Sequence, residues 1–285
     1  MKNCFNILVI ALCIISCDKY YFAGMIAPSG ADADGRFGQS MEYNAAHPIP
    51  TIHTDSDDYG VYVMTDCHLE DETQNLDKFV NIFIQDEGTV PFALCLGDLV
   101  NGEKPFDTFI SHTAAIQESG RRIFLTAGNH DLYWGRWKDF QKSFGTSTYC
   151  FEVITPSARD IFICVESGGG TLGARQREWL EETLKSECSD CRNIVVFTHT
   201  HFFMKEMSQG HTSNFPLEEA YDLTDLFRKY GVNLVLSGHD HHREQTIFKG
   251  VEYIIIDALE YGQKDAGYAI LSMGDGIRTE FFPIN

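Results

Sequence analysis

Two kinds of hydrophobic pattern alternate along this chain from residue 59 onward. Short, nearly continuous apolar runs rich in Val, Ile, Leu and Phe predict buried strands, and they lie at 60–64, 90–96, 122–126, 193–198 and 232–237. Between these runs, apolar residues recur at spacings of three and four positions, which predicts helices at 73–86, 106–117, 135–144, 174–185 and 217–230. This alternation of strand and helix is typical of the α/β class.

Beyond residue 238 the pattern changes to strands alone. It predicts strands at 244–248, 251–257, 268–273 and 278–282. A further pair of strands is expected inside the α/β part, at 149–154 and 161–165. Alternating strands and helices that end in a β meander fit two stacked sheets flanked by helices.

The beginning of the chain does not follow this pattern. Residues 5–15 form an apolar stretch after Lys2 that is too short for a membrane-spanning helix and is typical of a signal-peptide core. The four residues that end at Cys17 (Ile-Ile-Ser-Cys) resemble a bacterial lipobox. That resemblance implies that residues 1–16 are a lipoprotein signal peptide and that Cys17 carries a lipid anchor. The alternative is an ordinary signal peptide followed by an incidental cysteine.

Lipidation of Cys17 would place the protein in the bacterial cell envelope, anchored to a membrane on its periplasmic or surface side. Residues 17–58 are polar and rich in turn-forming residues, which predicts a tether followed by an N-terminal arm. Phe37, Met41 and Tyr43 are the apolar residues with which this arm could pack on the domain that begins at residue 59.

Composition limits the possible partners. The chain has 285 residues, of which 44% are hydrophobic, as expected of a folded globular protein. Its formal net charge is -19, and such an acidic surface argues against a nucleic-acid polymer as the main partner, because phosphate contacts need Lys and Arg. A small phosphate ester remains compatible, since bound divalent cations reverse the charge locally.

One cysteine pair has a spacing with chemical meaning. Cys188 and Cys191 form the only Cys-x-x-Cys motif of the chain, and the lack of a second motif argues against a zinc site. In an oxidising envelope they are expected to form a local disulfide or to remain as two idle thiols.

Five short polar motifs contain residues that bind metals, and almost every one of them follows a predicted strand. In chain order they are Asp66-Cys67-His68, Gly97-Asp98, Gly128-Asn129-His130-Asp131, His199 and Gly238-His239-Asp240-His241. Because functional groups of open α/β sheets lie at the carboxyl ends of the strands, the motifs are expected at one edge of the sheet. Nitrogen and oxygen ligands without thiolate favour Mn, Fe, Zn or Co.

These motifs, in this order, resemble the signature of the calcineurin-like metallophosphoesterases, which is D-x-H, G-D, G-N-H-D/E, a lone His and G-H-x-H. The resemblance covers residues 59–285 and implies a four-layer α/β/β/α sandwich of two mixed β-sheets flanked by helices. It also implies two divalent metal ions. The first would be bound by Asp66, His68, Asp98 and His241, and the second by Asp98, Asn129, His199 and His239.

The resemblance further implies roles for residues that do not bind metal. His130 is expected to face the scissile bond and assist the leaving oxygen, and Asp131 to orient His130. His201 and Arg136 are weaker candidates for contact with the substrate. Purple acid phosphatases have a tyrosine ligand where this chain has Asn101, so a Tyr-ligated Fe(III) site is not expected.

The activity implied by the resemblance is hydrolysis of a small phosphate mono- or diester by a metal-bridging hydroxide. Residues 173–180 are similar to a stretch found in cyclic-nucleotide phosphodiesterase-like members, which weakly favours a small diester. A protein phosphatase is not expected, because residues 97–103 lack the arginine that follows the G-D motif in that group. The alternative is a non-catalytic binding lipoprotein that retains the fold. The sequence leaves the oligomeric state open.

Overall fold

The computed structural model describes residues 31–202 and 215–284. The signal peptide predicted at residues 1–16, the anchor at Cys17 and the first part of the tether lie outside the described residues. Within the described ranges, no helix combines the length and the apolar character needed to cross a membrane.

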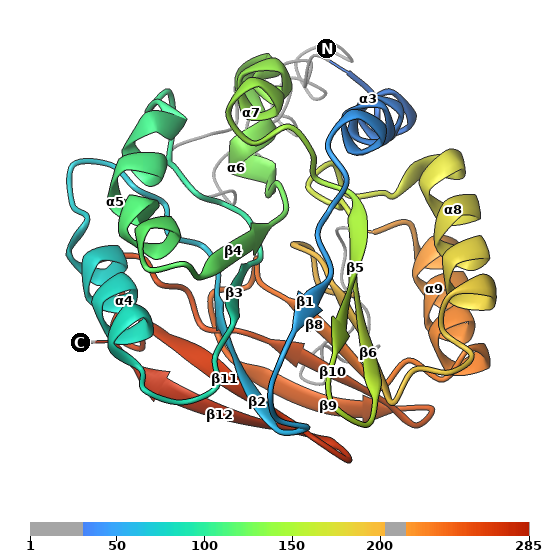
Figure 1. The fold of residues 1–285 in the computed structure, drawn as a ribbon. Helices are drawn as coiled ribbons and strands as arrows, with labels where there is room; N and C mark the ends of the chain where they lie inside the picture. The colour runs from blue at the N-terminus through green and yellow to red at the C-terminus, as the bar shows by residue number, and fades with distance from the viewer. Residues whose placement is uncertain (1–30, 203–214, 285) are drawn as a thin grey trace, which may run out of the picture.

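Two mixed β-sheets form the centre of the molecule (Figure 1). The five-stranded sheet has the order β12 (Ile277–Pro283), β11 (Gly267–Met273), β2 (Tyr59–Met64), β3 (Phe92–Cys95) and β4 (Arg122–Leu125). The seven-stranded sheet has the order β1 (Ile52–His53), β5 (Tyr149–Ile154), β6 (Arg159–Cys164), β7 (Asn193–Phe197), β8 (Leu234–Ser237), β10 (Val251–Ile255) and β9 (Glu244–Phe248).

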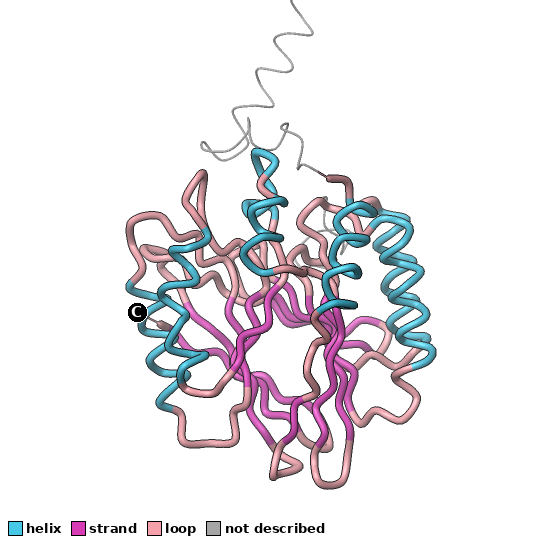
Figure 2. The backbone as a smooth tube through the Cα atoms, turned by 45° about the horizontal axis from the view of Figure 1, so that its top comes forward, coloured by secondary structure: helices cyan, strands magenta, loops and turns pink. Residues whose placement is uncertain are grey.

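Helices cover the outer faces of both sheets, so that the strands lie in the middle of the molecule (Figure 2). The five-stranded sheet packs against α4 (Gln74–Gln85), α5 (Phe106–Glu118) and α7 (Trp137–Phe144). The seven-stranded sheet packs against α8 (Gly173–Ser186) and α9 (Leu217–Lys229). The short helices α6 (Asn129–Leu132) and η1 (Tyr133–Gly135) follow β4. The predicted four-layer α/β/β/α sandwich is confirmed.

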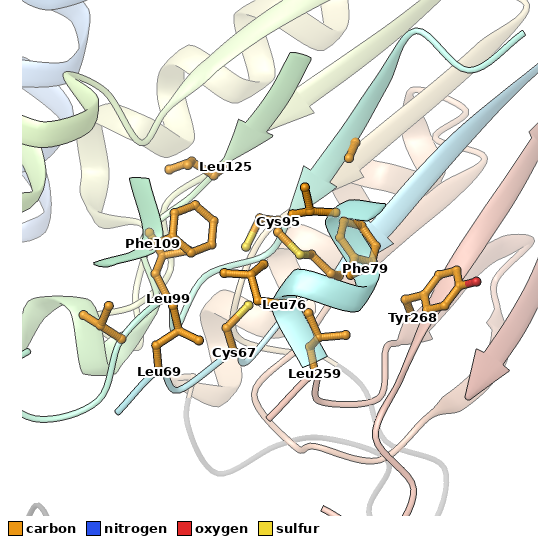
Figure 3. Close-up of a cluster of buried hydrophobic side chains, with 14 of the residues drawn as sticks. Cys67, Leu69, Leu76, Phe79, Cys95, Leu99, Phe109, Leu125, Leu259 and Tyr268 are labelled. Carbon is orange, nitrogen blue, oxygen red and sulfur yellow. The ribbon is translucent and has the colours of Figure 1, made fainter. Parts of the chain in front are cut away.

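The central strands are buried on both faces. In β2, Val61 and Val63 face the core between the sheets, whereas Tyr62 and Met64 face the helices. Figure 3 shows the helix-side cluster, in which Phe79 of α4 contributes one of the large rings. Burial on both faces explains why these strands appear in the sequence as continuous apolar runs rather than as alternating ones.

The N-terminal arm is folded against the domain. Asp32 caps helix α3 (Ala33–Ala46) by accepting a hydrogen bond from Gly35 N at 2.7 Å. Strand β1 then pairs in parallel with β5 and becomes an edge of the seven-stranded sheet. Residues 33–53 therefore belong to the same packed unit as the residues after 59, where the sequence places the start of the domain.

A buried ion pair fixes this arm. Arg36 Nε lies 2.6 Å from Glu166 Oε2, and only 3% of each side chain is exposed. Asn44 Nδ2 also donates to Thr148 O at 2.8 Å. Of the three apolar residues proposed for packing, Phe37 is buried, whereas Met41 and Tyr43 are partly exposed.

Candidate metal centre

The five sequence motifs meet where the two sheets come together. Strands β2, β3 and β4 run parallel to one another, as do β7 and β8, and each is followed by one of the motifs. A hydrogen bond from His239 N to Asp66 Oδ2 (2.9 Å) joins the segment after β8 of one sheet to the segment after β2 of the other. The side chain of His199, which follows β7, also reaches across, with Nδ1 2.9 Å from Leu96 O beyond β3.

The backbone of the site is unusual. Five of the expected ligands have a positive φ although they are not glycine, namely Asp66 (50°), His68 (41°), Asp98 (54°), His239 (74°) and His241 (65°). Asp and His are among the non-glycine residues that adopt this left-handed region most readily. At Gly97 (φ 100°) no residue with a side chain fits, because a Cβ there would lie 2.6 Å from Gly128 N.

One group of ligand atoms comes from the loops after β2 and β8. His68 Nε2 lies 3.0 Å from His241 Nε2. Asp66 Oδ1 lies 3.6 Å from His68 Nε2 and 3.4 Å from His241 Nε2. These three side chains form one of the groups that can hold a metal ion.

A second group comes from the segments after β3, β4, β7 and β8. Asn129 Oδ1 lies 2.9 Å from His199 Nε2 and 2.9 Å from His239 Nδ1. The two imidazole nitrogens are 3.2 Å apart. Asp98, His199 and His239 form another group that can hold a metal ion.

The carboxylate of Asp98 lies between the two groups. Its Oδ2 is 3.5 Å from His68 Nε2 in the first group and 3.3 Å from His199 Nε2 in the second. A carboxylate that touches both groups is suited to bridge two cations.

The donor atoms fit divalent metal ions. Two nitrogen or oxygen ligands of one ion, each about 2.1 Å from it, lie about 3.0–3.4 Å apart, which is close to most of the separations above. Asp66 Oδ1 is buried and has no hydrogen-bond partner, as expected for an atom whose partner is a cation. The contact of His199 Nδ1 with Leu96 O leaves Nε2 as the ligand atom, which is a common arrangement for a metal-binding histidine.

The electrostatics of the site also favour positive charge. Burial would raise the pKa values of Asp66 and Asp98, but the surrounding imidazoles outweigh it and hold both pKa values below the usual range. Burial would lower the pKa of His68, but Asp66 and Asp98 raise it to about 9. The charge of Asp98 likewise raises the pKa of His199 to about 10 despite burial. Two carboxylates thus attract cationic charge, either as protons on histidine or as metal ions.

His130 lies at this site, but its expected partner is different. Its Nδ1 lies 3.0 Å from Asn101 Oδ1, and its ring meets that of His68 edge to face at 4.5 Å. Asp131, which was expected to orient His130, is buried and accepts three backbone N–H groups instead. They belong to Asp98 (2.9 Å), Leu99 (3.0 Å) and Gly128 (2.9 Å). Asp131 therefore holds the Gly-Asp motif against the Gly-Asn-His-Asp motif.

The expectation that Arg136 contacts substrate is corrected in the same way. Arg136 is buried, and its guanidinium donates to Gly102 O at 2.6 Å and to Lys104 O at 2.5 Å. It also lies over the ring of Phe106. These contacts make Arg136 a support for the loop after β3.

His201 lies beside the metal ligands. Its ring centroid is 5.7 Å from that of His239, only 4% of the residue is exposed, and its Nδ1 has no hydrogen-bond partner. Burial and the charge of His199 lower the pKa of His201 to about 4. The neutral ring is therefore a candidate for contact with a bound ester.

Sequence reasoning missed Tyr133. Asn129 Nδ2 donates to Tyr133 Oη at 2.6 Å, which turns the amide so that Oδ1 faces His199 and His239. The sequence signal that could have found Tyr133 is its spacing of four residues from Asn129, which places the two side chains on one face of a helical turn.

Comparison with known proteins agrees with this geometry. Residues 59–243, more than half of the chain, match the family model described as calcineurin-like phosphoesterase. The serine/threonine-protein phosphatase CPPED1 of Rattus norvegicus is 24% identical over 187 residues, which cover 59% of this chain and 58% of that protein. The chain thus matches little more than half the length of this curated relative.

Two solved structures show the same fold at low identity. The purple acid phosphatase PPD1 from yellow lupin (Lupinus luteus) has a TM-score of 0.63 and 16% identity, over 81% of this chain and 52% of that one. GAP50 of Plasmodium, described as the anchor in the inner membrane complex, has a TM-score of 0.63 and 17% identity, over 80% and 85% of the two chains. Together with the family match, the fold and the five motifs identify this chain as a member of the calcineurin-like phosphoesterase family.

Proposed function

We propose that this protein hydrolyses a small phosphate mono- or diester with two divalent metal ions. The family and its phosphatase relatives support metal-dependent phosphoester hydrolysis. The position of Asp98 between two groups of ligands carries the proposal of two ions, because its Oδ2 approaches a histidine of each group within 3.5 Å. Asp66, His68, Asp98 and His241 would hold the first ion, and Asp98, Asn129, His199 and His239 would hold the second.

Bound at these positions, two divalent ions of Mn, Fe, Zn or Co would acidify a water molecule and neutralise charge on the phosphate oxygens. The chain's own residues hold the site in place and transfer protons during the reaction. His130 offers a ring nitrogen within 4.8 Å of ligand atoms of His68 and Asp98, where the leaving oxygen of an ester would lie. Asp131 keeps the backbone of Asp98 and Gly128 in register.

A phosphoprotein is the second candidate substrate. The observation in its favour is the name of the relative from Rattus norvegicus, a serine/threonine-protein phosphatase. The observation against it is that residues 97–103 lack the arginine that follows the Gly-Asp motif in protein phosphatases. Arg136 does not replace that arginine, because its guanidinium donates to backbone carbonyls of the loop after β3.

The first experiment compares hydrolysis of bis-p-nitrophenyl phosphate, p-nitrophenyl phosphate and a phosphoserine peptide in the presence of Mn(II). Asp98→Asn should abolish turnover and lower the metal content, because it disturbs both groups of ligands. Asp139→Asn, on the exposed face of α7, should leave both unchanged. Turnover by the Asp98→Asn protein at the wild-type rate would contradict the proposal, and hydrolysis of the peptide alone would favour the second candidate. Two bound metals without turnover would favour the non-catalytic binding lipoprotein.

We further propose that Cys17 is lipidated and anchors the protein in the bacterial cell envelope. The lipobox-like sequence before Cys17 supports this proposal. Labelling of cells with a radioactive fatty acid should mark the wild-type protein. Equal labelling of the Cys17→Ser variant would refute the proposal.

A further inference from the structure

Asn101 connects His130 to a carboxylate at the surface. Its Oδ1 lies 3.0 Å from His130 Nδ1, and its Nδ2 donates to Glu70 Oε1 at 2.8 Å. The backbone N–H of Gly102 donates to the same Oδ1 at 3.1 Å. Neither Glu70 nor Asn101 is among the expected metal ligands.

These contacts fix which way the amide of Asn101 points. An ionised carboxylate only accepts hydrogen bonds, so the NH₂ group must face Glu70. A backbone N–H only donates, so the carbonyl oxygen must face Gly102. Two independent partners therefore agree that Asn101 presents its oxygen, and not its nitrogen, to His130.

The orientation of the amide determines the tautomer of His130. Because Nδ1 faces an acceptor, Nδ1 must carry a hydrogen, and a neutral imidazole has only one. The lone pair of the neutral ring is therefore on Nε2. With the opposite amide orientation, Nδ1 would face a donor, and the lone pair would lie on Nδ1 instead.

The backbone around Asn101 is held firmly. Asn101 N donates to Leu69 O at 3.0 Å, and Leu69 N donates to Leu99 O at 3.2 Å, so the loop after β2 and the loop after β3 are tied together. On the other side, the ring of His130 meets those of His68 at 4.5 Å and Tyr133 at 4.9 Å. The imidazole thus packs against two neighbouring rings and is held at Nδ1.

We propose that Asn101 and Glu70 are positioning residues that hold His130 as its Nδ1–H tautomer, an inference that rests on the phosphoesterase function proposed above. During hydrolysis, Nε2 takes a proton from solvent water and transfers it to the leaving oxygen as the P–O bond breaks, while the attacking water releases one proton to solvent. The products are the alcohol and the phosphate, and the Nδ1 hydrogen stays directed at Asn101 throughout. Glu70 contributes by keeping the amide from rotating.

Nuclear magnetic resonance tests the tautomer without any turnover. Spectra of the metal-free full-length chain, labelled with ¹⁵N-histidine at neutral pH, distinguish a protonated Nδ1 from a protonated Nε2, and the spectrum of His130→Gln assigns the signal. We expect the Nδ1–H form in the wild type and in Asn101→Asp, which keeps an acceptor. Asn101→Leu, which has none, should lose it. An Nε2–H signal in the wild type would overturn the proposal.

Kinetics with two leaving groups test the consequence. A p-nitrophenyl ester and the matching phenyl ester differ in leaving-group pKa, so only the phenyl ester depends strongly on proton transfer. Asn101→Leu should lower kcat for the phenyl ester at least about tenfold more than for the p-nitrophenyl ester, with little change in KM. Asn101→Asp should restore the phenyl ester rate. Equal losses with both esters would indicate a merely structural role and overturn the proposal.

Glu70 provides a second variant that spares the core, because its side chain lies at the surface. Glu70→Ala should show the same selective loss in weaker form, and Glu70→Gln, which can still accept from Asn101, should recover the wild-type rate. Glu72→Ala is the matched control, since Glu72 accepts only from the exposed Gln74 among the contacts described. An unchanged ester ratio in Glu70→Ala would remove Glu70 from the proposal.

Failure of the proposed function gives a different result. A wild-type protein that hydrolyses neither ester would count against phosphoesterase activity, while the histidine spectra would still test the tautomer. A wild-type protein that hydrolyses both esters, with no change in ester ratio in Asn101→Leu, would leave the activity in place and overturn the positioning role.

Discussion

The three hydrogen bonds to Asp131 make Asp131→Asn an informative substitution. Oδ2 of the wild-type carboxylate accepts from Asp98 N and Gly128 N, and Oδ1 accepts from Leu99 N. An asparagine of the same shape has one oxygen, which can keep at most two of these donors. The third backbone N–H then faces the NH₂ group of the asparagine. Both that N–H and that NH₂ group are buried donors without an acceptor.

The expected loss of stability follows from that count. Each unsatisfied buried donor costs about 1–3 kcal/mol, so the loss of two acceptors should lower the free energy of unfolding by about 2–6 kcal/mol. The loss is a large part of the about 5–15 kcal/mol that stabilises a typical domain, but the variant should still fold. Urea unfolding of the metal-free protein, followed by circular dichroism, measures this free energy.

Glu178→Gln on the exposed face of α8 provides the control, and should change the free energy of unfolding by less than about 0.5 kcal/mol. A loss below about 1 kcal/mol for Asp131→Asn would refute the reasoning, since it would mean that the three amides find other acceptors.

Three further substitutions or reactions test separate parts of the structure. Arg36→Met leaves the buried carboxylate of Glu166 without its partner and should lower the free energy of unfolding by about 3–5 kcal/mol, measured by urea unfolding. Tyr133→Phe removes the acceptor that orients Asn129 and should weaken metal binding about tenfold to hundredfold in a calorimetric titration with Mn(II). Iodoacetamide should label Cys191 first, because the neighbouring Cys188 thiol lowers its pKa, and the rate should rise with pH through a midpoint below 9, followed by peptide mass spectrometry.

Each of these predictions has a control and a contrary outcome. Arg177→Met removes an exposed ion pair and should be nearly neutral; a similar loss in both arginine variants would argue against a special role for Arg36. Tyr230→Phe, at the end of α9, should leave metal affinity unchanged. If neither Cys188 nor Cys191 reacts until a reductant is added, the two form a disulfide and the free thiols of the structure do not persist in solution.

The fold was predictable because its central strands are buried on both faces. Continuous apolar runs such as that of β3 are visible without any structure, and almost every expected ligand motif follows such a run. Helix α3 was not predicted, because its packing depends on polar contacts. Its buried arginine meets Glu166, which is 130 residues away in the sequence, and no local pattern reports such a pair.

Prediction of the site from the sequence was limited in the same way. The positions of Asp66, Asp98 and His239 in the structure follow the expected arrangement, because ligand identity is a property of single residues in short motifs. The roles expected for Asp131 and Arg136 differ from the structure because both depend on which backbone groups come near. Asp131 meets amides from two motifs, and Arg136 meets carbonyls more than thirty residues away. Proximity of this kind is set by the loops between strands, which carry no readable periodicity.

The left-handed backbone at five ligand positions has a consequence for how this site can change in evolution. Asp and His satisfy two demands there, since they bind metal and also tolerate a positive φ. If selection for metal binding were lost, these positions would still require a positive φ, because the loops would still be enclosed by the two sheets. Descendants of this chain that have lost catalysis should therefore carry Gly or Asn at these positions more often than Ala, Val or Leu. A former metal centre of this family would remain recognisable by glycine or asparagine at these positions after its ligands had disappeared.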